Sequence, residues 1–280
     1  MVAAQPAPEV LNRHLLVTIS NEPSCFYGVR FVVSFFSVKK NINVTLFYVG
    51  SSSKEPNDVN RREATEAQKM ALDLLTMSGF PEKNITMKIA EKRFGIVQDI
   101  VREGHEGLYD AVVLGRRGYL AFEGLLGTST SREILEARID FPVWVCKSIT
   151  LPHRHIIVAT DGSEASLRIA DHVGFMIKDE DHTVTVCHVG SPSEQSERII
   201  EEAVEAILAN GVEKERITTE IIQGKKPAEA LLQKMKESNA IAMAIGRSKA
   251  KEGTLRGWLM GSCSSKILSD FEAGALWISK

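Results

Sequence analysis

Two glycine-rich segments of the chain have the residue types that bind phosphate groups. The first is Gly-Arg-Arg-Gly at residues 115–118, followed after eight residues by Gly-Thr-Ser-Thr at 127–130. Glycines let the backbone approach an anion closely, and the hydroxyl groups add hydrogen-bond donors. A helix is expected over residues 131–137, and its N-terminal dipole would favour phosphate by about 0.3–1 kcal/mol per charge. The segment predicts a phosphate loop, with a turn capped by Thr and Ser as the alternative.

The second glycine-rich segment has a longer spacing. It begins as Gly-Arg-Ser-Lys at residues 246–249 and continues as Gly-Ser-Cys-Ser at 261–264. Lys249 occupies the position that Gly118 has in the first segment. Its ammonium group could contact a phosphate, although a lone surface lysine is more often only solvated.

A carboxylate follows an expected strand in the second half of the chain. Asp161 comes directly after an apolar run and precedes Gly162 and Ser163. At the carboxyl end of a strand, this side chain could accept hydrogen bonds from a ribose or a base. An aspartate that stabilises a turn or caps a helix is the alternative.

Both glycine segments belong to a repeat that covers the whole chain. The sequence Arg-His-Leu-Leu-Val at residues 13–17 returns as Arg-His-Ile-Ile-Val at 154–158, about 140 residues later. Further pairs keep the same order, and their spacing changes where loops would absorb insertions. We therefore predict two domains, residues 1–150 and 151–280, with a loose N-terminal tail at about 1–12.

Each repeat alternates short apolar runs with amphipathic stretches. The runs are rich in Val and Ile, as in strands buried between two helix layers. Ser163 is placed to cap a helix, and Pro227 is placed to begin one. This alternation predicts an α/β fold with a parallel, doubly wound sheet. The expected strands are 14–19, 43–49, 85–89, 111–114 and 143–146 in the first repeat, and 155–160, 183–189, 217–222, 241–245 and 275–278 in the second.

The last strand of each repeat has no helix after it within its own repeat. Such an edge strand needs a partner, because its backbone groups would otherwise remain unpaired. We predict that residues 143–146 pair with residues 275–278 and join the two halves as a pseudo-dimer.

Composition excludes several classes of protein. The 280 residues are 44% hydrophobic and 25% charged, with a net charge of −2, so neither global disorder nor a basic nucleic-acid-binding surface is expected. No apolar run is long enough to cross a membrane, and the first residues lack the features of a secretory signal. The four cysteines form no CxxC pair, which favours reduced, mostly buried thiols in a cytoplasmic protein. The seven histidines form no ligand-spaced cluster, so no structural metal is expected.

The common catalytic motifs are also missing from the sequence. The segment that begins Gly224-Lys225-Lys226 does not satisfy the Walker A pattern, and there is no Gly-x-Ser-x-Gly elbow. Neither a carboxylate pair nor a Ser-His-Asp constellation can be assigned. We therefore expect no enzyme, or at most weak ATP hydrolysis, since bound ATP and water need little more than positioning.

Taken in order, these motifs resemble the universal stress protein family, in two copies that cover nearly the whole chain. Residues 158–163, Val-Ala-Thr-Asp-Gly-Ser, resemble the family's first-strand signature, and the glycine segments resemble its G-x2-G-x9-G-[S/T] signature. Residues 142–145, Pro-Val-Trp-Val, resemble its last strand. The resemblance implies a five-stranded parallel sheet in each domain, like that of the adenine-nucleotide alpha-hydrolases, and association through the final strands.

The ATP-binding branch of the family also implies a site for ATP or another adenine nucleotide, with or without Mg²⁺. In this chain the second-half positions would be Thr160, Asp161, Val189, Gly246, Gly261, Ser262 and Ser264. The first-half positions would be Val49, Gly115, Gly118, Gly127, Thr128 and Thr130.

Each half departs from the family pattern in two respects. One concerns length, because the glycine spacing of the first half is one residue short and the loop of the second half is longer. The other concerns residue type. The first half keeps its glycines but has Ser20 in place of the aspartate, which removes hydrogen bonds worth about 1–3 kcal/mol if they are buried. The second half keeps Asp161 but lacks the second glycine.

Three functional hypotheses follow from this pattern. The first is a stress-response regulator that binds a nucleotide in one or both domains without strong turnover. The second is an interaction or scaffold protein whose nucleotide sites have decayed, with unknown protein partners. The third is a slow ATPase. In each case the intramolecular pseudo-dimer could pair again as a homodimer.

Overall fold

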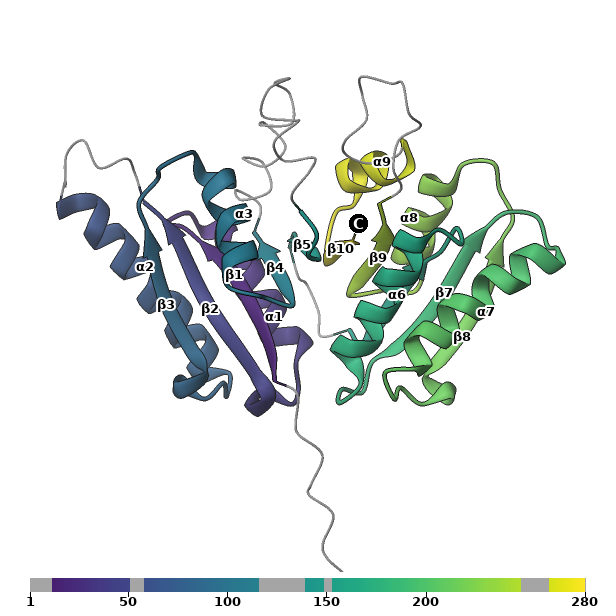
Figure 1. Ribbon diagram of the computed structural model, residues 1–280, viewed down its shortest axis with the longest axis horizontal. Helices are drawn as coiled ribbons and strands as arrows, with labels where there is room; N and C mark the ends of the chain where they lie inside the picture. Colours follow the sequence, from purple (N-terminus) through teal and green to yellow (C-terminus); the bar gives the residue numbers. More distant parts are fainter. Residues whose placement is uncertain (1–11, 51–57, 116–138, 149–152, 248–261, 280) are drawn as a thin grey trace, which may run out of the picture.

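The computed structural model describes residues 12–50, 58–115, 139–148, 153–247 and 262–279. Within these ranges the two halves share one continuous ten-stranded sheet, in the order β3-β2-β1-β4-β5-β10-β9-β6-β7-β8. Figure 1 shows the first half on the left and the second half on the right, each with its own helices.

The strands lie where the apolar runs predict them, to within two residues at each end. In the first half they are β1 Arg13–Ile19, β2 Ile42–Val49, β3 Ile85–Ala90, β4 Ala111–Leu114 and β5 Val143–Cys146. In the second half they are β6 His155–Ala159, β7 Thr183–Val189, β8 Ile217–Ile222, β9 Ala242–Gly246 and β10 Ala275–Ser279. Every pairing within a half is parallel. The predicted parallel, doubly wound arrangement is thereby confirmed.

Helices cover both faces of the sheet. One face carries α1 Tyr27–Phe35, α2 Asp58–Met77, α6 Glu164–Ile177 and α7 Glu194–Leu208. The other face carries α3 Ile96–Glu106, α8 Pro227–Glu237 and α9 Ser262–Asp270. Short 3-10 helices lie at Pro23–Phe26, Lys39–Asn41, Glu82–Asn84 and Lys214–Arg216. Two apolar cores result, one on each side of the sheet, and each continues from one half into the other.

The two halves meet through their final strands. β5 and β10 pair antiparallel, with Trp144 directly opposite Trp277, which confirms the predicted pseudo-dimer. The two indole rings stack at a centroid distance of 4.0 Å and an interplanar angle of 1°, and both are fully buried. Burial of two large aromatic rings at one point makes this junction a strong apolar contact between the halves.

Polar contacts reinforce the junction beside the tryptophans. Arg13 of β1 is fully buried and reaches across to the second half, where its Nε donates to the carbonyl of Phe175 at 3.0 Å. The same guanidinium pairs with Asp179 at 2.9 Å. The Glu180 carboxylate accepts from the backbone N–H of Ser37 at 2.7 Å and also from its hydroxyl group. These contacts fix the register of one half against the other.

The outer surfaces of the halves differ in chemistry. The exposed large hydrophobic side chains found in the described ranges all belong to the first half, and they are Met70, Leu74, Met77, Met87, Ile89, Phe94 and Leu108. All four cysteines are free, and Cys263 alone among them is not buried. No described helix combines the length and the apolar character needed to span a membrane.

Candidate functional site

A pocket of about 180 Å³ lies at the carboxyl ends of β6, β7 and β9. β6 lies between β7 and β9 in the sheet, so this is the point where the strand order reverses. Ligands of open α/β sheets bind at such points. The pocket is lined by Ala159, Thr160, Asp161, Ser166, Cys187, His188, Val189, Pro227, Leu231, Ile245, Gly246, Cys263, Ser264 and Ile267. Five of the residues predicted from the sequence are therefore brought together, namely Thr160, Asp161, Val189, Gly246 and Ser264.

Asp161 lies in the turn that connects β6 to α6. Its Oδ1 accepts the backbone N–H of Ser163 at 3.0 Å, and Gly162 has the positive φ of 76° that this turn requires. Ser163 caps α6, because its side chain accepts the backbone N–H of Ser166. Burial raises the pKa of Asp161, but hydrogen bonds from Ser163 and Ser166 outweigh it, so the net pKa lies below its usual value. Asp161 therefore presents a carboxylate, a strong acceptor, at the pocket.

His188 is a member of the pocket that sequence reasoning missed. Its Nδ1 lies 2.9 Å from the carbonyl oxygen of Thr160, which can only accept, so Nδ1 carries the proton and Nε2 is left as an acceptor. Gly190 leaves room for the ring, since a Cβ at that position would lie 2.8 Å from His188 Nε2. The Thr160 hydroxyl lies 3.1 Å from that of Ser166. The side chains at the end of β6 are thus held in place by one another.

Gly246 has a structural reason to be glycine. A Cβ at this position would lie 2.4 Å from the backbone nitrogen of Ser166, because the first turn of α6 packs directly on the end of β9. Gly115 occupies the same place in the first half, where a Cβ would lie 2.4 Å from the carbonyl oxygen of Cys25. Both glycines are therefore needed for helix packing, whatever ligand the loops bind.

Two cysteines line the pocket, and both remain thiols at neutral pH. Burial, with a smaller effect of Glu220, raises the pKa of Cys187 to about 12. Burial also raises the pKa of Cys263, and the nearby Asp161 charge adds to it. A thiol with a raised pKa is a poor nucleophile. These side chains contribute apolar wall, together with Leu231 and Ile267.

Several predicted positions lie outside the described residues. They are Gly118, Gly127, Thr128 and Thr130 of the first half, Gly261 of the second half, and the predicted helix at 131–137. Ser262 is described only as the first residue of α9. Val49 ends β2 and Gly115 follows β4, so both lie at the carboxyl edge of the first-half sheet.

The end of β1 has different chemistry from the end of β6. When the two repeats are aligned, Ile19 corresponds to Thr160, Ser20 to Asp161 and Cys25 to Ser166. The Ser20 hydroxyl donates to the Cys25 sulfur at 2.8 Å. The first half thus has no carboxylate at this position.

One described cluster has metal-binding side chains. Ligand atoms of Glu180, Asp181 and His182 lie within 4.8 Å of one another. However, the Arg154 guanidinium lies 2.8 Å from Asp181 and 4.0 Å from Glu180, and Glu180 is already bonded to Ser37. A fixed cation beside these carboxylates disfavours a second one. We assign this cluster to the junction between the halves.

Comparison with known proteins gives a family match for the second half of the chain and a fold match for the whole chain. Residues 152–273 match the model of the universal stress protein family. A universal stress protein from Archaeoglobus fulgidus is 19% identical, with 97% of both chains covered and a TM-score of 0.68. A putative universal stress protein from Pseudomonas aeruginosa is 16% identical, with 97% of this chain and 94% of that chain covered and a TM-score of 0.56. A universal stress protein in complex with cAMP is 23% identical, with 46% of this chain and 97% of that chain covered and a TM-score of 0.39. No curated protein sequence matches the chain.

Proposed function

We propose that this chain, whose residues 152–273 match the model of the universal stress protein family, is a regulatory protein that binds an adenine nucleotide without strong turnover. The observation that supports this most is the convergence of Thr160, Asp161 and Val189 with Gly246 and Ser264 at one pocket. These residues come from the turn after β6, from the ends of β7 and β9 and from α9, and only the fold brings them together. The reduced cysteines fit a cytoplasmic protein.

The pocket suits the nucleoside part of such a ligand. About 180 Å³ is small for a whole drug-sized molecule, so the base and ribose would occupy it and the phosphates would extend outward. Apolar side chains of Val189, Leu231 and Ile267 would pack against the base. The Asp161 carboxylate would accept hydrogen bonds from ribose hydroxyls, and His188 Nε2 would accept another donor.

The start of α9 faces the same pocket through Ser264 and Cys263. The first N–H groups of a helix are unpaired within the helix, and its dipole favours an anion there. We therefore infer that the phosphates lie toward the N-terminus of α9. The protonated thiols of Cys187 and Cys263 favour binding over covalent chemistry at this site.

Calorimetric titration with AMP, ADP, ATP and cAMP tests the proposal, after a denatured sample has been checked for copurified nucleotide. We expect one site of micromolar affinity. Asp161→Ala should weaken it about tenfold or more, because one or two hydrogen bonds to a charged acceptor are lost. Ser20→Ala changes the matching position of the first half and serves as the control, with unchanged affinity expected.

Three outcomes would contradict parts of this proposal. The absence of both binding heat and copurified nucleotide would reject nucleotide binding and favour the scaffold hypothesis. An equal loss of affinity in Ser20→Ala would place the site in the first half. Steady-state phosphate release above background with Mg-ATP would replace the non-turnover reading with a slow ATPase.

A further inference from the structure

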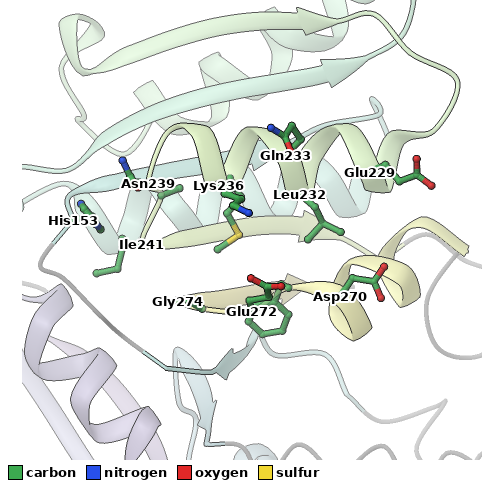
Figure 2. A pocket seen from close by; sticks show the side chains of 14 residues that line it. His153, Glu229, Leu232, Gln233, Lys236, Asn239, Ile241, Asp270, Glu272 and Gly274 are labelled. Carbon is green, nitrogen blue, oxygen red and sulfur yellow. The ribbon is translucent and has the colours of Figure 1, made fainter.

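A second pocket, of about 490 Å³, lies beside α8 and shares no lining residue with the nucleotide pocket. Figure 2 shows it as a groove with α8 along one wall and the segment that leads into β10 along the other. We call it the α8 groove. It is lined by His153, Glu229, Leu232, Gln233, Met235, Lys236, Asn239, Ala240, Ile241, Asp270, Phe271, Glu272, Ala273 and Gly274.

The first half fills the corresponding space with aromatic side chains. Phe141, three residues before Trp144, packs so closely on α3 that a Cβ at Gly104 would lie 2.5 Å from the Phe141 ring. Tyr109 follows the turn at the end of α3, where it is buried and donates to Glu103 at 2.7 Å. His105 adds an edge contact to the Phe141 ring at 5.1 Å.

The second half replaces these aromatic residues with small ones. Gly274, three residues before Trp277, occupies the position of Phe141, and Ala240 occupies that of Tyr109. The turns match closely, since Leu108 and Asn239, which precede Tyr109 and Ala240, have φ values of 50° and 49°. The second half therefore lacks the two aromatic rings that pack beside α3 in the first half, and the groove lies at the two corresponding positions, Gly274 and Ala240.

The walls of the α8 groove are held by backbone hydrogen bonds. The N–H of Gly274 donates to Ser148 at 3.0 Å, and the N–H of Ala275 donates to Ile241 at 2.9 Å. A Cβ at Gly274 would lie 2.5 Å from the Ile241 carbonyl oxygen, so this wall cannot carry a side chain there. A preformed groove binds a ligand without first paying an ordering cost.

The charges in the groove leave one cation and one anion free on opposite walls. Glu229 pairs with Lys226 at 3.2 Å, and Asp270 pairs with Lys266 at 2.8 Å. Across the part of the chain that the structure describes, neither Lys236 of α8 nor Glu272 of the facing wall has an ion-pair partner within 4.0 Å. In Figure 2 Glu272 rises from one wall into the groove and Lys236 lies on the wall above it.

We propose that the α8 groove binds a small zwitterion with an apolar body, of the class of apolar amino acids and dipeptides. The ligand carboxylate would pair with Lys236, and the ligand ammonium with Glu272. The apolar body would lie on Leu232 and the buried side chains of Met235 and Phe271. The volume of about 490 Å³ lies within the range of small-molecule sites. This inference is independent of the nucleotide site.

Titration with the dipeptide leucyl-phenylalanine, followed by calorimetry or by ligand-observed NMR, tests the proposal. We expect saturable binding with a submillimolar to millimolar dissociation constant. The N-acetylated and C-amidated dipeptides should each bind at least about tenfold more weakly, because each lacks one charge. Glu272→Gln and Lys236→Gln should cause similar losses, whereas Glu202→Gln, at an exposed residue of α7 that does not line the groove, should cause none.

A filling variant gives an independent test. Ala240→Tyr restores the first-half residue and should abolish dipeptide binding while leaving AMP binding unchanged. If Ala240→Tyr does not fold, the exposed charge variants alone decide the question. No saturable binding up to about 10 mM dipeptide (a free energy of about −2.7 kcal/mol), equal binding of the blocked dipeptides, or competition by AMP would each overturn the proposal.

Discussion

The two halves of this chain have the same strand order and helix layers, yet the ends of their first strands differ. β6 is followed by Thr160 and Asp161 and then by a helix that Ser163 caps. β1 ends at Ile19 and is followed by Ser20 and then by the 3-10 helix Pro23–Phe26, where Glu22 makes no capping side-chain bond. The first half therefore keeps the strand order and helix layers of the second half, while the polar groups that follow its first strand are different.

What the halves share is explained by packing. Gly115 and Gly246 both lie against the backbone of the helix that follows the first strand of their half, at Cys25 and at Ser166, and Trp144 stacks on Trp277. The halves differ at two pockets, which are the pocket at the end of β6 and the α8 groove. Within a repeat protein, a position that differs at a pocket is therefore a better candidate for function than a position that is repeated.

Acidification should reveal the largest energetic difference between the halves. Burial lowers the pKa of His172 to about 3, and burial together with Arg154 lowers the pKa of His182 to about 3. Both histidines belong to the second half. In the unfolded chain these two histidines take up protons near pH 6.5, whereas in the folded protein they do so only near pH 3. The free energy of unfolding therefore falls as the pH is lowered from about 6.5 toward 3. Between pH 7 and 5 the two residues should cost about 4 kcal/mol of unfolding free energy.

Urea unfolding at the two pH values measures this loss. His172→Phe introduces the residue that the repeat has at position 31 and should remove about half of the pH-dependent loss. An unchanged pH dependence in this variant would mean that His172 is already charged in the folded protein.

Alanine at the two packing glycines should destabilise both halves alike. A new Cβ would lie 2.4 Å from the carbonyl oxygen of Cys25 at Gly115 and 2.4 Å from the backbone nitrogen of Ser166 at Gly246. Overpacking of this kind costs about 1–3 kcal/mol. Thermal unfolding of Gly115→Ala and Gly246→Ala would measure it. If Gly246→Ala were fully stable but lost nucleotide affinity, this glycine would serve the ligand and not the helix.

Sequence patterns were sufficient for the fold and for five of the 14 residues that line the candidate site. Apolar runs set the strands, and the unpartnered final strands required the β5–β10 pairing. The positions at strand ends, such as Asp161 and Val189, could also be predicted, because parallel strands place their carboxyl ends at one edge. His188, Leu231 and Ile267 could not, since which residues of a strand or helix line a pocket depends on side-chain packing across elements. The α8 groove lies where the second half has Gly274 and Ala240 in place of the aromatic residues of the first half, and no sequence motif predicts such a groove.

The tryptophan pair should respond asymmetrically to substitution. Trp144 Nε1 donates to His172 Nε2 at 3.0 Å, whereas Trp277 Nε1 has no hydrogen-bond partner in the described ranges. Phe31 is the residue of the first half that corresponds to His172, and the Phe31 ring contacts the Trp277 ring edge-on at a centroid distance of 6.3 Å. Trp144→Phe leaves the His172 acceptor buried without a donor and should cost about 1–2 kcal/mol more than Trp277→Phe. Equal losses in urea unfolding would show that the hydrogen bond contributes nothing net.

The smallest expected difference concerns the helix caps. Ser163 accepts the backbone N–H of Ser166 at 3.2 Å at the start of α6, so Ser163→Ala should cost about 1 kcal/mol. Glu22→Ala, at the matching position, removes no such bond and should cost less. The cap also fixes the turn that carries Asp161, so Ser163→Ala should weaken AMP binding together with stability, whereas Glu22→Ala should leave AMP binding unchanged. Loss of stability in Ser163→Ala with full AMP affinity would show that the cap is not needed for AMP binding. In that case the Gly162 turn and the hydrogen bond from the Ser163 backbone N–H to the Asp161 carboxylate would be sufficient to position Asp161.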